Sequence, residues 1–149
     1  MVKCRPMKLL VKRLDPAAQI PEYKTAGAAA FDIASTEAKT LAPGEIYRFK
    51  TGLVFVIPTG HFMLIASRSS NAPKKGLGMA NGIGVIDSDY CGENDELFIC
   101  LQNISNGEVV VEAGERIAQA LILPAPQMEI VETLATGAVD RGGFGSTGK

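Results

Sequence analysis

The sequence predicts an all-β fold, and three observations support this prediction. Short stretches rich in β-branched and aromatic residues recur along the 149-residue chain. Glycine, proline, asparagine and aspartate separate these stretches, as they do in sandwiches, barrels and jelly rolls. No stretch shows the apolar spacing of a long amphipathic helix. One domain is expected, because a chain of this length suffices for a single core.

The expected strands follow from these stretches in chain order. Residues 9–14 form the first candidate strand, and residues 46–57 form a longer one in which Gly52 marks a bulge or a bend. Further strands are expected at residues 62–66, 97–101, 109–111, 117–123 and 128–131. Turns are expected where proline or glycine interrupts the pattern, at residues 42–44, 58–60 and 113–115.

Two segments fall outside the strand pattern. Residues 69–75 favour one or two helical turns with Ser69 or Ser70 as the N-cap. Residues 136–149 are rich in glycine, and we expect this tail to be flexible. We therefore divide the chain into a domain of residues 1–136 and a C-terminal segment of residues 137–149.

The composition excludes several classes of function. A net charge of −1 gives no general attraction to nucleic acid. No apolar run is long enough for a signal peptide or a membrane-spanning helix, so no membrane partner is expected. The three cysteines lack C-x-x-C spacing and are expected to be reduced thiols in an intracellular, cytoplasmic protein. With His61 as the only histidine, a structural zinc site is not expected.

Residues 81–90 combine an amide, glycines, carboxylates and a phenol in one short β-rich segment. Asn81 and the bare backbone at the glycines are suited to reading the edge of a uracil, and a deoxyribose can stack on Tyr90. Asp87 follows an apolar Val-Ile pair and can take a proton from water as a general base. A polar hairpin built from ordinary turn residues is an equally weighted alternative.

Arg68-Ser69-Ser70, at the end of an expected strand, is suited to phosphate. The guanidinium of Arg68 grips phosphate oxygens in a fork, and the serine hydroxyls add donors. A helix that begins here would point its N–H groups at an anion. Taken alone, a helix cap beside a surface arginine is the commoner explanation.

Three more side chains have both a chemical and a structural interpretation. Asp32 follows a run of small residues and can hold water around a Mg²⁺ ion that is bound mainly to phosphates, although a turn-capping aspartate is commoner. Gln119 alternates with apolar neighbours and can offer its amide to a phosphate, although an edge-facing glutamine is commoner. Arg116 is expected in a structural ion pair or an oligomer contact.

Residues 143–149 formally match G-x-x-x-x-G-K, the phosphate loop of nucleoside triphosphatases. We reject that interpretation, because the required Ser or Thr after the lysine is missing and the α/β context is absent. Glycines interleaved with Phe144, Ser146 and Thr147, after Arg141, can still cradle phosphate and cap a base as a closing lid does. A disordered tail is the alternative.

Together and in order, these segments resemble the five motifs of the trimeric dUTPase family. The matching segments are residues 27–33, 67–70, 82–93, 114–119 and 141–148. No single motif is decisive, but five in order are very specific. The resemblance implies a distorted jelly roll (the β-clip fold), a homotrimer with active sites shared between subunits, and Mg²⁺-dependent hydrolysis of dUTP to dUMP and pyrophosphate. Such an activity limits uracil incorporation into DNA and supplies dUMP for dTMP synthesis.

The resemblance also implies a role for each site residue. Asp87 would activate the water that attacks the α-phosphorus, Tyr90 would leave no room for a 2′-hydroxyl, and Asp32 would order water around the metal ion. Uracil would be read by Asn81 and by the backbone at Gly84, Val85, Ile86 and Phe98. The phosphates would be held by Arg68, Ser69, Ser70 and Gln119. The lid would bring Arg141, Ser146 and Thr147 to the γ-phosphate and Phe144 to the uracil ring.

The chain departs from the family pattern at several positions. Ala30 replaces a usual glycine in the first motif, and Ser67 and Ser70 replace proline and glycine in the second. Cys91 stands where a larger polar residue is common. The segment formed by residues 93–96 is longer than is usual in the family, so a bulge is expected in the strand that follows. The fifth motif has two residues fewer than usual after Arg141.

Three alternatives remain at this stage. The dCTP deaminase family shares the fold, but its proton-shuttling glutamate falls three residues before the asparagine that ends the strand. Here that asparagine is Asn103, and Cys100 occupies the glutamate position, so deamination is disfavoured. A non-catalytic jelly-roll module is a second alternative. A homologue that binds a regulatory protein through residues 93–96 is a third.

Overall fold

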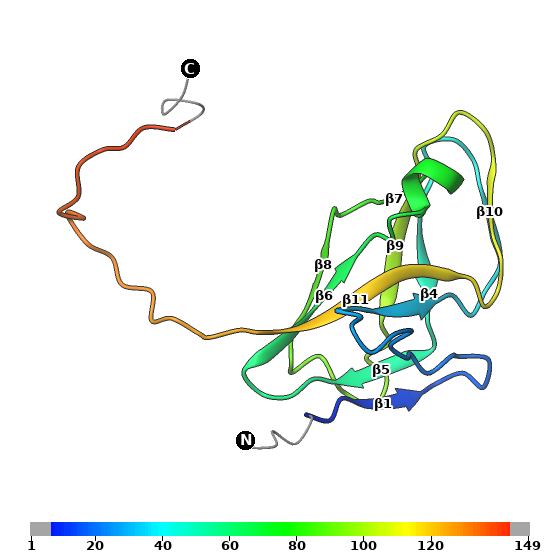
Figure 1. The fold of residues 1–149 in the computed structure, drawn as a ribbon, viewed down its shortest axis with the longest axis horizontal. Helices are drawn as coiled ribbons and strands as arrows, with labels where there is room; N and C mark the ends of the chain where they lie inside the picture. Colours follow the sequence, from blue (N-terminus) through cyan, green and yellow to red (C-terminus); the bar gives the residue numbers. More distant parts are fainter. Residues whose placement is uncertain (1–6, 144–149) are drawn as a thin grey trace.

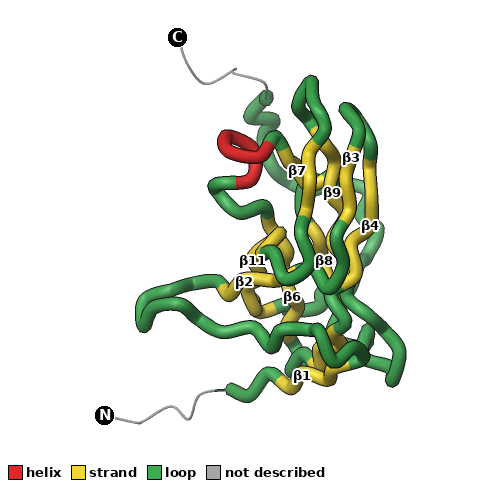
Figure 2. Tube along the Cα trace, turned by 90° about the vertical axis from the view of Figure 1, so that its right-hand side faces the viewer, coloured by secondary structure: helices red, strands yellow, loops and turns green. Residues whose placement is uncertain are grey.

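The fold is built from antiparallel strands, as the sequence predicts (Figures 1 and 2). The computed structural model describes residues 7–143. In chain order the elements are β1 (Leu10–Arg13), β2 (Phe31–Ala34), β3 (Lys39–Leu41), β4 (Ile46–Lys50), β5 (Leu53–Val56), β6 (His61–Ala66), the helical turn η1 (Asn71–Lys75), β7 (Leu77–Met79), β8 (Gly84–Ile86), β9 (Phe98–Asn103), β10 (Val109–Val111) and β11 (Arg116–Pro124).

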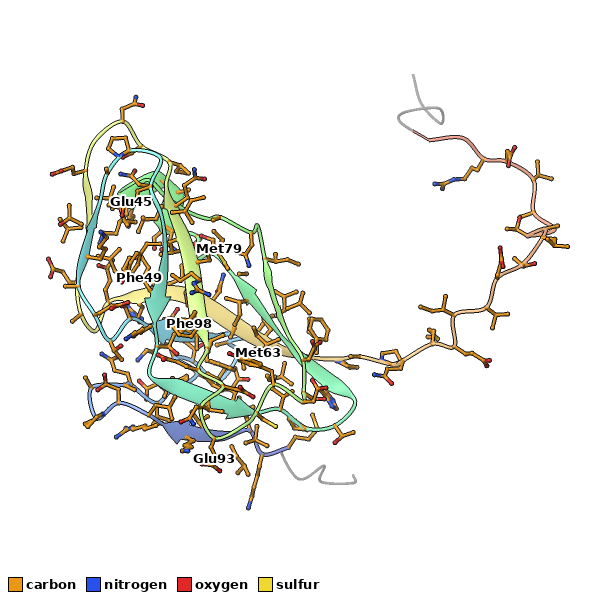
Figure 3. All side chains as sticks on the ribbon, turned by 180° about the vertical axis from the view of Figure 1, so that it is seen from behind. Glu45, Phe49, Met63, Met79, Glu93 and Phe98 are labelled. Atoms are coloured by element: carbon orange, nitrogen blue, oxygen red, sulfur yellow. The ribbon has the colours of Figure 1, made fainter. Side chains whose placement is uncertain are left out.

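Two larger sheets and two strand pairs enclose one core. The larger sheets have the orders β2-β11-β6-β8 and β4-β9-β7, and the pairs are β1-β5 and β10-β3. Figure 3 shows Phe49 and Met63 within the body of the molecule, where both are fully buried. Burial of each such side chain contributes about 1.5–3 kcal/mol to the free energy of folding.

The predicted stretch 46–57 is two strands, because the chain bends at Gly52. Gly52 has φ +65°, and a Cβ atom there would lie 2.8 Å from the Cβ of Asp15 and 2.9 Å from that of Ala18. Only glycine fits this conformation and this space. The bend moves the chain from β4 in one sheet to β5 in another.

The other expected elements are confirmed with two exceptions. The turns at Gly44, Gly60 and Gly114 have positive φ angles of 78°, 77° and 81°. Residues 71–75 form the expected helical turn η1, and Ser70 occupies its N-cap but makes no side-chain capping hydrogen bond. The bulge expected in β9 is absent, because β9 pairs with β4 and β7 in unbroken register.

The strand expected at residues 128–131 is wrong. Within the described residues no strand follows Pro124, and residues 125–143 run away from the sheets (Figure 1). Met128, Ile130 and Val131 are 75%, 98% and 70% exposed. A strand needs a hydrogen-bonded neighbour, and an apolar sequence alone supplies none. Among the described residues, no helix has the length and apolar character needed to cross a membrane.

Candidate active site

Asp32 is the centre of a cluster of polar side chains on the β2-β11-β6 sheet. Its Oδ1 accepts a hydrogen bond from Arg68 Nε at 2.9 Å, and its Oδ2 accepts one from Arg116 Nη1 at 2.9 Å. Arg68 Nη1 also donates to the Arg116 carbonyl at 3.0 Å, and Gln119 Nε2 donates to the Ser67 carbonyl at 2.8 Å. The ion pair expected for Arg116 is confirmed. Asp32 lies on a strand, so it is not a turn cap.

A register shift in β11 brings this cluster onto one face. Arg116 pairs with Ala34 but Ala118 pairs with Ile33, so one extra residue, Ile117, bulges between them. In a regular strand Arg116 and Gln119, three positions apart, would point to opposite faces, because side chains alternate along a strand. The bulge puts both on the face of Asp32. The Ile117 carbonyl accepts a hydrogen bond from the buried Asn71 side chain at 2.8 Å. The residue pattern of this segment does not predict the shift.

The predicted phosphate segment follows β6 directly. The carbonyl of Arg68 accepts a hydrogen bond from the N–H of Asn71 at 3.0 Å, which closes a turn over Ser69 and Ser70. Ser69 is exposed and Ser70 is half-buried. The Ser70 hydroxyl makes no capping hydrogen bond to η1 and Ser69 is exposed, so both are suited to donate to an anion, beside a guanidinium held by Asp32.

Asp87 stands at the opposite end of the β6-β8 ladder. It follows β8 directly and is exposed, and its carbonyl accepts a hydrogen bond from the N–H of Tyr90 at 3.2 Å. A cavity of about 790 Å³ lies beside it, lined by the 59–62 turn, residues 87–89 and residues 124–127. In the described part of the chain no ion pair engages the Asp87 carboxylate, so it is open to water.

Tyr90 is 40% exposed and its ring has a fixed support. The phenol donates a hydrogen bond to the main-chain carbonyl of Glu96 at 3.0 Å. The N–H of Tyr90 is held by the carbonyl of Asp87. The predicted base and the predicted sugar platform therefore share one turn.

The predicted uracil-reading backbone lies on strand edges. β7 pairs with β9, β8 pairs with β6, and β7 and β8 do not pair with each other, so residues 81–90 are not a simple hairpin. In the described sheets each of these strands has one unpaired edge, whose N–H and C=O groups can bind a base. Position 84 also requires glycine for a structural reason, because a Cβ atom there would lie 2.9 Å from the Cβ of Ile65.

One chain does not bring all the predicted residues together. Met63 pairs with Ile86, so Asp87 falls beside Phe62, and Arg68 lies about six residues further along β6 and beyond it. At about 3.3 Å per residue, the two ends are roughly 20 Å apart. Val85 and Ile86 lie at the end of the sheet where Asp87 is, and Gln119 lies at the end where Arg68 is. Phe98 is the first residue of β9, and the centre of its ring is 5.5 Å from the guanidinium carbon of Arg48.

The predicted lid is only partly described. Arg141 belongs to the segment of residues 125–143 that runs away from the sheets (Figure 1). Phe144, Ser146 and Thr147 lie outside the described residues. Their roles, and the division of the chain at residue 136, stay predictions.

Metal binding by the protein alone is not indicated. Among residues 7–143, no group of three or more His, Cys, Asp or Glu side chains could hold a metal ion. Each Asp32 oxygen accepts one hydrogen bond from an arginine, and a carboxylate oxygen has capacity for a second. Asp32 therefore fits the predicted contact with metal-bound water, for an ion held chiefly by substrate phosphates.

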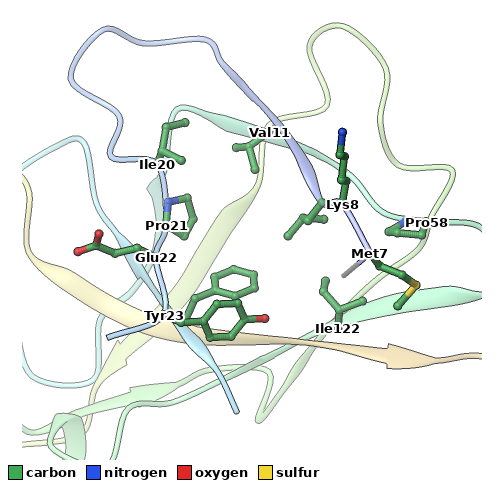
Figure 4. A pocket seen from close by; sticks show the side chains of 11 residues that line it. Met7, Lys8, Val11, Ile20, Pro21, Glu22, Tyr23, Pro58 and Ile122 are labelled. Carbon is green, nitrogen blue, oxygen red and sulfur yellow. The ribbon is translucent and has the colours of Figure 1, made fainter. Parts of the chain in front are cut away.

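A second cavity is apolar and separate from these residues. It has a volume of about 530 Å³ and lies between β1, the 20–23 segment and β11. Figure 4 shows Val11, Ile20, Pro21 and Ile122 around it. On the wall of this cavity the ring of Tyr23 packs edge-on against that of Phe31, with 5.5 Å between the ring centroids. None of the predicted site residues within the described part of the chain lines it.

Comparison of sequences finds relatives that match nearly the whole chain. Residues 17–148 match the sequence model of the family described as dUTPase. The deoxyuridine 5′-triphosphate nucleotidohydrolase of Nautilia profundicola is 46% identical over 145 residues, covering 96% of this chain and 100% of that protein. The protein of the same name from Anaeromyxobacter sp. (strain Fw109-5) is 42% identical over 149 residues, covering 97% of this chain and 99% of that protein.

Solved structures show the same likeness in three dimensions. The Staphylococcus bacteriophage 80alpha dUTPase with dUPNHPP superposes with a TM-score of 0.85 at 30% identity, covering 95% of this chain and 99% of that chain. The dUTPase from Streptococcus mutans superposes with a TM-score of 0.74 at 31% identity, covering 83% of this chain and 99% of that chain. The predicted jelly-roll-like fold agrees with both.

Proposed function

This chain belongs to the dUTPase family and hydrolyses dUTP to dUMP, and from that premise we propose that Asp87 is the general base. The position of Asp87 carries the proposal: an exposed carboxylate, next to a cavity, on the same turn as Tyr90. A general base must reach a water molecule and the substrate at once, and this position allows both.

The proposed reaction is a single displacement at the α-phosphorus. A water oxygen attacks that phosphorus, and its proton passes to the Asp87 carboxylate. The bond between the α-phosphorus and the bridging oxygen to the β-phosphate breaks, and pyrophosphate leaves with the bond's electrons. The Nε–H of Arg68 already donates to Asp32, and one Nη1–H donates to the Arg116 carbonyl. Arg68 therefore holds the phosphates with its remaining N–H groups. Ser69, Ser70 and Gln119 add neutral donors.

We assign recognition of uracil and of the sugar to the residues around Asp87, away from the phosphate-binding residues. Asn81 and the unpaired edge of β8 at Gly84, Val85 and Ile86 would read the base, with the backbone at Phe98. The ring of Tyr90 would stack beneath the deoxyribose. Arg141, Phe144, Ser146 and Thr147 would close over the γ-phosphate and the base.

The family depends on a divalent metal ion, and we propose Mg²⁺ for this chain. Bound to the phosphates, Mg²⁺ would neutralise charge that develops on the leaving pyrophosphate. Asp32 would orient water in that ion's shell. The fit of Asp32 to this task rests on the acceptor capacity left on its two oxygens.

We also propose that each site is shared between chains of a homotrimer. The roughly 20 Å between Asp87 and Arg68 along β6 supports this, because one α-phosphate cannot touch both within a single chain. The bare apolar residues after Pro124 support it too, because such residues favour contact with another chain. An intracellular location is supported by the free thiols of Cys91 and Cys100.

Pyrophosphate release in the presence of Mg²⁺, from dUTP, UTP, dTTP and dCTP in parallel, tests the proposed selectivity. Fast release from dUTP alone is the expected result. Release from UTP at a similar rate would remove Tyr90 from sugar recognition. Ammonia from dCTP without pyrophosphate would indicate deamination despite Cys100.

A further inference from the structure

We propose that Glu96 is a positioning residue that fixes the ring of Tyr90 and thereby sets the enzyme's preference for deoxyribose. The inference rests on the proposed role of Tyr90 as the sugar platform. It assigns a task to the 93–96 insertion, which the catalytic proposal leaves without one.

The contact to Tyr90 comes from the main chain of Glu96. The Tyr90 phenol donates to the Glu96 carbonyl oxygen at 3.0 Å, and the phenol bond spans the whole insertion. At 40% exposure the ring of Tyr90 is only partly covered, so the hydrogen bond of its phenol has a large share in fixing its orientation. The orientation of the ring therefore depends on where that one carbonyl lies.

The side chain of Glu96 fixes the position of its own main chain. Its Oε1 accepts a hydrogen bond from the Gly52 N–H at 2.8 Å, in a partly buried setting. The next residue is held as well, because the Leu97 N–H donates to the Leu53 carbonyl at 2.8 Å and the buried Thr51 hydroxyl donates to the Leu97 carbonyl at 2.6 Å.

The anchor for Glu96 is a rigid part of the fold. Gly52 lies at the bend between β4 and β5, where contacts with Asp15 and Ala18 leave no room for a side chain. The chain cannot shift there without disturbing two sheets. Through Glu96, a fixed point in the core is connected to a ring at the surface.

The rest of the insertion has its own contacts. The Gly92 N–H donates to Asp95 Oδ2 at 2.7 Å, which closes a small turn. Glu93, which is labelled in Figure 3, forms an ion pair with Lys12 of β1. The Lys12 Nζ also donates to the Glu93 carbonyl at 2.8 Å. The Lys12 ammonium, mainly through its hydrogen bond, lowers the pKa of Glu93. This tether is solvent-exposed and does not touch Tyr90, so it provides a matched control.

Ring position matters because a 2′-hydroxyl is a small group. A sugar platform rejects it only if the ring cannot move aside, and rejection by shape alone is typically worth a factor of about 10–200. Loss of the Glu96 carboxylate leaves the Gly52 N–H unpaired, releases the carbonyl that holds the phenol, and lets the ring yield to a ribose.

The experiment measures kcat/KM for dUTP and for UTP in the full-length enzyme. Glu96→Ala is expected to lower the dUTP/UTP ratio at least about 10-fold, chiefly through KM. Glu96→Gln keeps an oxygen acceptor for the Gly52 N–H and is expected to retain the ratio. Tyr90→Phe removes only the phenol bond and is expected to match Glu96→Ala, and the double variant should be no worse than either. Lys12→Met is expected to leave the ratio unchanged.

The outcomes separate this inference from the proposed site. An unchanged ratio in Tyr90→Ala would refute the sugar-platform role itself. A lowered ratio in Tyr90→Ala, with an unchanged ratio in Glu96→Ala, would overturn only the positioning role. Additive losses in the double variant, or an equal loss in Lys12→Met, would also overturn it. If Glu96→Ala does not fold, an unchanged ratio in Tyr90→Phe decides against the inference.

Discussion

Asp32 and Arg68 form an ion pair at 2.9 Å across the strand β11, although 36 residues separate them in the chain. Their side chains are only 18% and 24% exposed, and Arg116 completes the cluster from the other carboxylate oxygen. The predicted phosphate site is thus held in place before a substrate arrives, which is the usual requirement for electrostatic catalysis.

Replacing Asp32 tests how much this cluster stabilises the fold. Asp32→Ala is expected to lower the free energy of unfolding by about 1–3 kcal/mol, because the partly buried guanidinium of Arg68 and the more exposed one of Arg116 both lose their acceptor. Arg116→Ala should cost less, since its side chain is 46% exposed. Urea unfolding of both variants measures the difference, and equal losses would contradict the central place of Asp32.

Asp87→Asn is expected to slow dUTP turnover by about 10²–10⁴-fold, because an amide cannot accept the proton of the attacking water. Folding and dUTP binding should be largely intact, since Asp87 is exposed and in no ion pair among the described residues. Single-turnover kinetics and equilibrium binding measure the two effects separately. Near-normal turnover in this variant would refute the assignment of Asp87 as the general base.

Mixing two inactive variants tests the sharing of sites between chains. If Asp87 and Arg68 of one site come from different chains, Asp87→Asn and Arg68→Ala chains refolded together in equal amounts should recover activity in about a quarter of the sites. Each variant refolded alone is the control. No recovery in the mixture, with intact assembly, would mean that one chain supplies both groups.

Deleting residues 139–149 is expected to cut turnover while the assembly survives, because the proposed lid closes over substrate and is not core. Turnover assays and the mass of the assembly in solution give the two readouts. Val139 is 95% exposed, so its removal uncovers no packed surface. Loss of the assembly on deletion would mean that this segment is structural.

Gly84→Ala is expected to destabilise the fold by about 1–3 kcal/mol, because the added Cβ would lie 2.9 Å from the Cβ and 3.1 Å from the Cγ1 of Ile65. Ile65→Ala keeps the Cβ but removes Cγ1, and it is itself destabilising because Ile65 is buried. The double variant should therefore lose less than the sum of the two single losses. Thermal unfolding of the single and double variants measures this. A fully tolerated Gly84→Ala would leave the uracil-binding role as the main reason for glycine there.

The sequence predicted the longer strands and the glycine turns, because both leave local signals. The bend at Gly52 is an example, since a glycine inside a β-rich stretch is visible without any neighbour. The shorter strands β2, β3, β7 and β8 were not separately resolved, because three or four residues show little periodicity. The strand expected at 128–131 failed because pairing depends on a neighbour that the sequence does not specify.

The site was predicted residue by residue, but not its arrangement. Asp32, Arg68 and Gln119 were named individually, yet their common face depends on the bulge at Ile117, which carries no sequence signal. The link from Tyr90 to Gly52 through Glu96 was also invisible, because it joins segments that are distant in the chain. Long-range contacts of this kind are decided by packing, and local propensity does not record them.

The bare apolar side chains beyond Pro124 affect how the protein must be handled. A lone chain presents Ile130 and Leu134 almost entirely to water, and such surfaces promote nonspecific association. If chains assemble as we propose, highly diluted enzyme should lose specific activity as the chains separate. Rapid overproduction should give insoluble material if chains accumulate faster than they meet in the correct geometry. Slow expression and concentrated stocks follow as the practical choice.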